Sequence, residues 1–118
     1  MSVETDIFDT LQSLVSGRCY PDEAPSGAAL PYIVYQQIGG ESVLYMENVL
    51  PSKKNGRYQV AVWATTRTEA ASVSLAAEAA MVASTDFQVT PLGAAVADID
   101  SQTNYRGARQ DFSVWSDR

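Results

Sequence analysis

The sequence predicts an α+β domain in which two helices pack on one face of a mostly antiparallel sheet of four to five strands. Residues 57–64 alternate between two faces in the way that half-buried strands do. Segments 2–16 and 67–84 have helical patterns and helix-starting residues. The predicted order is helix, strand, strand, helix, strand, strand, which is typical of a layered α+β fold. We therefore expect residues 1–118 to form a single domain.

The first predicted helix spans residues 2–16. Ser2 is placed to cap its N-terminus, and Gly17 is placed to end it. Apolar residues recur at steps of three and four and form one stripe: Val3, Ile7, Leu11, Leu14 and Val15. This stripe is expected to face the sheet.

Extended and irregular segments follow the first helix. Residues 18–20 form a short extended piece, and 21–31 contain three prolines and one glycine, which are incompatible with regular structure. Residues 32–38 alternate as a strand and end at Gly39-Gly40. We expect an ordered connector that leads into the first long strand.

The second predicted helix, residues 67–84, is rich in alanine. Thr66 and Glu69 form a capping box: the Thr66 hydroxyl accepts from the amide of Glu69, and the Glu69 carboxylate accepts from the amide of Thr66. Small side chains allow a helix to lie close to a sheet. Residues 87–92 and 104–115 are the remaining strand candidates, separated by the loose, small-residue stretch 93–98.

Segment 41–56 is the least regular part of the chain. It contains apolar residues that are expected to be exposed, among them Tyr45, Met46 and Leu50. Asn55-Gly56 is typical of a type I′ turn, so we expect the segment to fold back as a ribbon into the strand at 57–64. Long excursions of this kind are often functional.

The composition excludes several kinds of chemistry. The chain has no histidine, so imidazole catalysis and histidine zinc sites are absent, and its one cysteine, Cys19, reads as a small buried hydrophobe. Asp98-Ile99-Asp100 resembles the start of a calcium loop, but the following residues do not complete one. The sequence therefore predicts no catalytic residue, no metal and no cofactor.

The net charge of −6 disfavours nucleic acid and anionic membranes as partners. No apolar run approaches the ~20 residues that cross a bilayer, and the acidic N-terminus does not resemble a secretory signal. The protein is therefore expected to act in a cytoplasm.

Two charged clusters are candidates for a complementary contact between subunits. The basic cluster consists of Lys53, Lys54 and Arg57. The acidic cluster, at the start of the first helix, consists of Glu4, Asp6 and Asp9. The alternative for each cluster is a set of ordinary solvent-exposed charges without a partner. Acidic residues in particular are favourable in the first turn of a helix. A basic tip on an otherwise acidic protein nevertheless favours contact with an acidic neighbour.

Trp63 is the candidate anchor on the sheet. If both helices cover one sheet face, Trp63 lies on the other face with Gln59 and Ala61. This arrangement fits a subunit interface. It also fits a small ligand-binding or enzyme-accessory domain, which would need a closed apolar pocket. RNA binding to the sheet aromatics is a weaker alternative, since basic residues to face the phosphates are missing.

Four segments, in this order, resemble the small tail-completion (tail-terminator, head–tail joining) proteins of long-tailed bacteriophages and prophages. Typical features of that family are a Pro-Asp after the first helix, a Leu-Pro-Tyr entering the first long strand and a final Asp-Phe-Ser-Val-Trp. The matching segments are Ser16-Gly17-Arg18-Cys19-Tyr20-Pro21-Asp22, Gly27-Ala28-Ala29-Leu30-Pro31-Tyr32-Ile33-Val34-Tyr35-Gln36, Arg57-Tyr58-Gln59-Val60-Ala61-Val62-Trp63-Ala64 and Arg109-Gln110-Asp111-Phe112-Ser113-Val114-Trp115.

The resemblance implies a structural role without enzymatic activity. Proteins of this family are thought to form a ring, commonly of six subunits, on the end of the tail tube. The ring stops polymerisation of the major tail-tube protein, offers a surface to the head-connector protein and leaves an opening for DNA. The implied location is the virion tail, with assembly in the host cytoplasm, and no membrane or sequence-specific nucleic acid is involved.

Overall fold

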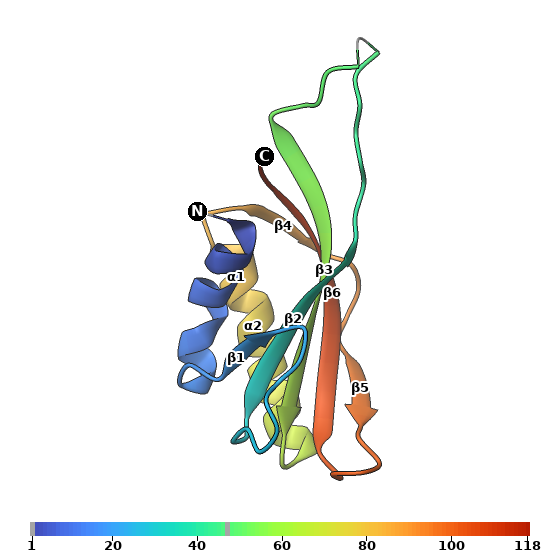
Figure 1. Cartoon of the computed structure of the whole chain (residues 1–118). Coiled ribbons are helices and arrows are strands. Elements are labelled where there is room, and N and C mark those ends of the chain that lie inside the picture. Colours follow the sequence, from blue (N-terminus) through green and yellow to red (C-terminus); the bar gives the residue numbers. More distant parts are fainter. Residues whose placement is uncertain (1, 47) are drawn as a thin grey trace.

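The computed structural model describes residues 2–46 and 48–118 as one twisted sheet with both α-helices on the same face (Figure 1). This confirms the predicted α+β fold, although the sheet has six strands. The elements are α1 (Val3–Leu11), the 3₁₀ helix η1 (Gln12–Val15), β1 (Cys19–Pro21), β2 (Tyr32–Gly39), β3 (Lys53–Ala64), α2 (Arg67–Ala83), β4 (Gln88–Pro91), β5 (Val96–Ile99) and β6 (Arg106–Asp117).

Strands β3 and β6 form the centre of the sheet. They pair antiparallel over their whole lengths, from Lys53 opposite Asp117 to Ala64 opposite Arg106. The strand order is β1-β2-β3-β6-β4, and only the β1–β2 pair is parallel. Strands β4 and β5 pair with different halves of β6, so they follow one another along the same edge.

The helix boundaries follow the predicted caps. The Ser2 hydroxyl accepts a hydrogen bond from the Thr5 amide at 3.2 Å, and α1 continues as η1 until Ser16 and Gly17 adopt positive φ. A single α-helix over 2–16 is therefore replaced by an α-helix and a 3₁₀ turn. Such turns are common at helix C-termini.

The start of α2 confirms one half of the capping box and corrects the other. Thr66 Oγ1 accepts from the Glu69 amide at 3.2 Å, as predicted. The Glu69 carboxylate accepts from the amide of Thr65, at 3.4 Å, and not from that of Thr66. Thr66 has an extended backbone, in which successive amides point in opposite directions. The Thr65 amide is thus the one that faces Glu69.

Substitution of Thr66 by alanine is expected to lower the free energy of unfolding by about 1 kcal/mol, because the Glu69 amide loses its acceptor. Urea denaturation measures the change. Thr68→Ala is the matched control, since Thr68 is an exposed residue inside the same first turn with no recorded side-chain hydrogen bond. Equal effects of the two substitutions would contradict a capping role for Thr66.

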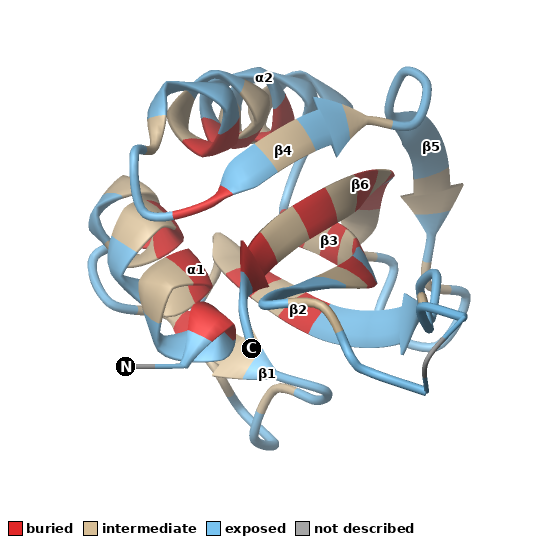
Figure 2. Ribbon diagram, turned by 90° about the horizontal axis from the view of Figure 1, so that it is seen from above, coloured by how far each residue is buried: buried red, intermediate tan, exposed pale blue. Residues whose placement is uncertain are grey.

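The hydrophobic core lies between the helices and one sheet face (Figure 2). Alternate residues of β3 and β6 point into it, as the period of two in the sequence predicts. Ile7 and Leu11 of α1 and Met81 of α2 are fully buried against them. The largest fully buried side chain is that of Phe112 in β6. The face opposite the helices carries the half-buried Gln59, Ala61 and Trp63, as expected.

The predicted turn at Asn55-Gly56 is wrong. Both residues lie inside β3, where Asn55 is opposite Trp115 and Gly56 is opposite Val114. Glycine is required at position 56 for a packing reason: a Cβ there would lie 2.6 Å from the ring of Tyr58. Strand β3 therefore begins at Lys53, four residues earlier than predicted, and pairs with the C-terminal end of β6.

Strand β5 overlaps a stretch that was predicted to be loose, residues 93–98. Its four residues alternate poorly between apolar and polar types, so they give little strand signal. The strand forms because it pairs with Arg106–Arg109 at the start of β6. Short edge strands of this kind depend on a partner that is distant in the sequence.

Candidate functional site

Residues 40–46 and 48–52, between β2 and β3, form a protruding arm (Figure 1). The molecule measures 52 × 25 × 24 Å, and the arm extends along the long direction (Figure 1). At its base the Glu41 amide donates to Asn55 Oδ1 at 2.9 Å, and the Arg118 amide donates to the Ser52 carbonyl at 2.8 Å. At its tip the Tyr45 amide donates to the Val49 carbonyl at 3.1 Å.

The arm exposes large apolar side chains to solvent. Met46 is 100% exposed, and its apolar neighbours are about half exposed: Leu44, Tyr45, Val49 and Leu50. None of them belongs to the hydrophobic core. The structure therefore brings together the predicted interface residues Tyr45, Met46 and Leu50 on one projection away from the core.

The predicted basic cluster lies at the base of this arm, on β3, and two of its members have acidic neighbours within the chain. Lys53 forms an ion pair with Asp117, the residue opposite it in β6. Arg57 contacts one carboxylate oxygen of Asp111 through Nη2 at 2.6 Å and Nε at 3.1 Å. The hydrogen bond and charge of Lys53 lower the pKa of the exposed Asp117 carboxyl. Lys54 is exposed, with no ion pair among the described residues.

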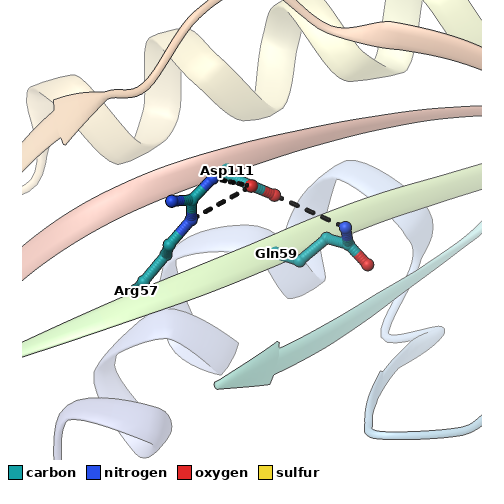
Figure 3. A network of polar contacts seen from close by, with 3 residues as sticks. All are labelled: Arg57, Gln59 and Asp111. Atoms are coloured by element: carbon teal, nitrogen blue, oxygen red, sulfur yellow. Dashed lines mark hydrogen bonds and ion pairs between the residues drawn. The ribbon is translucent and has the colours of Figure 1, made fainter. Parts of the chain in front are cut away.

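Asp111 links Arg57 to Gln59 on the open sheet face, because its carboxylate contacts both side chains (Figure 3). Its second oxygen accepts from Gln59 Nε2 at 3.4 Å. Asp111 is directly opposite Gln59 in the β3–β6 ladder, which explains why the three side chains meet. The guanidinium of Arg57 is thus held on the strand surface.

The predicted acidic cluster lies on α1, on the helix-covered side of the sheet, whereas Arg57 shares the open face with Gln59. Glu4 and Asp9 are exposed and Asp6 is half-buried on α1. Val3, which precedes Glu4, lines the same small crevice as Lys54. Contact between the acidic cluster of one subunit and the basic cluster of a neighbour therefore stays a prediction.

Trp63 packs across the central strand pair on the face opposite the helices. Its ring lies over Gly107, where a Cβ would come within 2.7 Å of Trp63 Cζ3. Trp63 forms part of the lining of a hollow of about 340 Å³. Together with one cation, Arg109, which pairs with Asp98, four carboxylates border this Trp63 hollow: Asp22, Glu23, Asp98 and Asp100. The site is thus an acid-rimmed recess.

A second recess, which the sequence analysis missed, lies between α2 and β5. This α2–β5 groove has a volume of about 300 Å³ and is lined by Arg67, Ala71, Ser74, Leu75, Ala94, Ala95, Ala97, Gly107, Ala108 and Gln110. Leu75 is 68% exposed. From Thr68 to Ala83 the charged residues of α2 are Glu69 and Glu78, both half-buried, and its fully exposed positions carry neutral side chains. That missing charge was the available signal.

Cys19 lies in β1 and is buried in the core. Burial raises the pKa of its thiol from an ordinary value of 9.0 to about 12. The thiolate is the reactive form of cysteine, so the folded protein holds Cys19 in an unreactive state near neutral pH.

We expect Cys19 to react slowly with a thiol reagent at pH 8 in the native protein and quickly in urea. A raised folded-state pKa also means that the contribution of this thiol to stability is constant below about pH 9 and is lost as the pH rises toward 12. Absorbance of the released chromophore measures the labelling rate, and denaturation at several pH values measures the stability. Equal labelling rates with and without urea would contradict burial of the thiol.

Within residues 2–46 and 48–118, no helix has the length and hydropathy to span a bilayer. Among the same residues, no group of three or more His, Cys, Asp or Glu side chains is arranged to hold a metal ion.

Comparison with known proteins identifies the family. The family profile described as tail completion protein gp17 matches residues 9–117, from within α1 to the end of β6. A search of curated proteins gave no significant match. The family match covers nearly all of the chain and confirms the resemblance that the sequence motifs indicated. The chain therefore belongs to the tail completion protein gp17 family and is a structural component of bacteriophage tails.

Proposed function

We propose that this protein is a tail-terminator subunit that assembles into a ring, commonly of six copies, on the end of the completed tail tube. The ring stops polymerisation of the major tail-tube protein and presents a surface to the head-connector protein. This proposal extends the family assignment, which is limited to a tail-completion role.

The observation that carries the proposal is the arm. Its exposed apolar side chains, from Leu44 to Leu50, form no part of the core of the subunit. Contiguous apolar surface of this kind in a soluble protein usually marks an interaction site. Such a projection is expected in a subunit that functions in an assembly, because a neighbouring subunit can bury its apolar side chains.

The charge of the chain is compatible with the same role. The net charge is −6, and carboxylates also border the Trp63 hollow on the open sheet face. Negative walls repel passing phosphates, which favours transit of DNA without adhesion. A ligand-binding role at Trp63 would favour a closed apolar pocket, whereas the recess there has an acidic rim.

Light scattering after size exclusion, over a range of concentrations and with or without tail-tube protein, tests the proposal. We expect a discrete oligomer, either of the protein alone or on the ends of tubes. A strict monomer under all these conditions would contradict the proposal. A monomer that assembles only on the tube end would support it.

A further inference from the structure

The α2–β5 groove has the properties of a socket for an apolar segment. Small side chains form most of its lining, and Leu75 stands exposed beside it. Arg67, the first residue of α2, contributes its only charged side chain. No ion pair is recorded for Arg67 among the described residues. The groove therefore suits an occupant that is apolar with a negative charge nearby.

We propose that the arm of a second copy of this chain occupies the α2–β5 groove. The inference rests on the self-assembly in the proposed function and names the surfaces that meet. Leu44, Tyr45 and Met46 near the tip supply large apolar side chains, and the alanine-lined groove supplies the space for them. Burial of both surfaces removes apolar area from water.

Charge favours this groove over the Trp63 hollow. Residues 40–52 contain two glutamates, no lysine and no arginine. The Trp63 hollow is lined by four carboxylates and one cation, Arg109, which forms an ion pair with Asp98. Its excess of carboxylates would repel the arm and lose hydration beneath the apolar tip. Arg67 at the α2–β5 groove instead attracts the arm. The two recesses are thus distinguished by the sign of their charge.

The placement of arm and groove makes the contact heterologous. The arm projects from one end of the molecule, while β5 and the start of α2 lie toward the other end, so a subunit does not fill its own groove (Figure 1). Each copy then offers one projection and one socket at different places on its surface. Repetition of such a contact closes a ring when the rotation between copies permits it.

The backbone of the arm is also available to a neighbour. Between its base and its tip, no backbone hydrogen bond joins residues 42–44 to residues 50–52 in the described part of the chain. Extended chain with free amides and carbonyls readily pairs with another segment. Strand β5 contributes to the lining of the groove, and its outer edge pairs with no further strand among the described residues.

Disulfide trapping between two different variants tests the inference. Met46→Cys places a thiol at the arm tip and Ala95→Cys places one at the groove; both positions are exposed, so the subunit should fold normally. The two proteins are mixed with tail-tube protein and oxidised mildly. We expect a reducible dimer that contains one chain of each variant and that neither variant forms alone. Ala24→Cys, at the Trp63 hollow, replaces Ala95→Cys in the matched control.

The outcomes separate the inference from the proposed function. Mixed dimers with Ala95→Cys and not with Ala24→Cys support arm-to-groove docking. If oligomers form but Met46→Cys does not cross-link to Ala95→Cys, the inference is overturned and the proposed ring stands. The same holds if Met46→Cys cross-links to Ala24→Cys instead. Failure of the unmodified chain to assemble at any concentration, with or without tube protein, overturns both.

Discussion

Replacement of Phe112 by alanine is expected to lower the free energy of unfolding by about 3–5 kcal/mol. Phe112 lies at the centre of β6, is 1% exposed and packs within the core between the sheet and both helices. Its truncation leaves a cavity bounded by rigid elements that cannot close around it. Since small domains are stable by only about 5–15 kcal/mol, this single change removes a large part of the total.

Urea denaturation of the purified subunit measures this loss. Phe8→Ala is the matched control, because Phe8 is an aromatic residue that is only half-buried at the edge of the same core. We expect the Phe8 variant to lose clearly less stability. A loss below about 1 kcal/mol for Phe112→Ala would contradict the central position of this side chain.

Introduction of aspartate at both Leu44 and Met46 is expected to abolish assembly and leave the free subunit folded. Both side chains are exposed on the arm, so their replacement should change the free energy of unfolding by no more than about 0.5 kcal/mol. In an assembled ring both aspartates would enter the alanine-lined groove, where Arg67 is the only charged side chain, so at least one carboxylate would be buried without a partner at a high desolvation cost. Light scattering measures assembly, and urea denaturation measures the stability of the subunit.

The double variant Ser42→Asp, Ser52→Asp is the charge-matched control. It adds the same two carboxylates to the arm and keeps the apolar side chains. Both serines are exposed near the base of the arm. We expect this control to assemble. Normal assembly of the Leu44, Met46 variant would show that the apolar arm has no part in subunit contacts.

The elements that depend on local sequence were predictable. Ser2 and Thr66 cap the two helices as expected, because a hydroxyl needs only an amide two or three residues away. The alternation in 57–64 correctly separated the buried Val60 and Val62 from Gln59 and Trp63 on the open face. These signals act over a few residues and are visible in one chain.

The errors arose where a distant strand decides the structure. Asn55-Gly56 has the composition of a turn, but the long partner β6 extends the ladder through it, and Asn55 Nδ2 donates to Ser113 Oγ at 2.9 Å. Strand β5 was missed because its pairing with β6, rather than its own composition, creates it. Single-sequence patterns contain little information on such long-range pairing.

The candidate site was only partly predicted, because some of its contacts also join segments that are distant in the sequence. The apolar residues of segment 41–56 stood out because no periodic pattern included them, and the structure places Tyr45, Met46 and Leu50 on the arm. The basic cluster was easy to see, but Asp111 and Asp117, which partner Arg57 and Lys53, are more than fifty residues away. The α2–β5 groove combines two distant segments, so only the fold reveals it.

Electron microscopy of tail tubes polymerised with and without this protein tests the central claim most directly. The account predicts that tubes grown in its presence stop elongating and carry a ring-shaped density at one end only. It also predicts that the Leu44→Asp, Met46→Asp variant fails to cap them. Tubes that continue to grow at the same rate, with the wild-type protein absent from their ends or spread along their walls, would contradict the account.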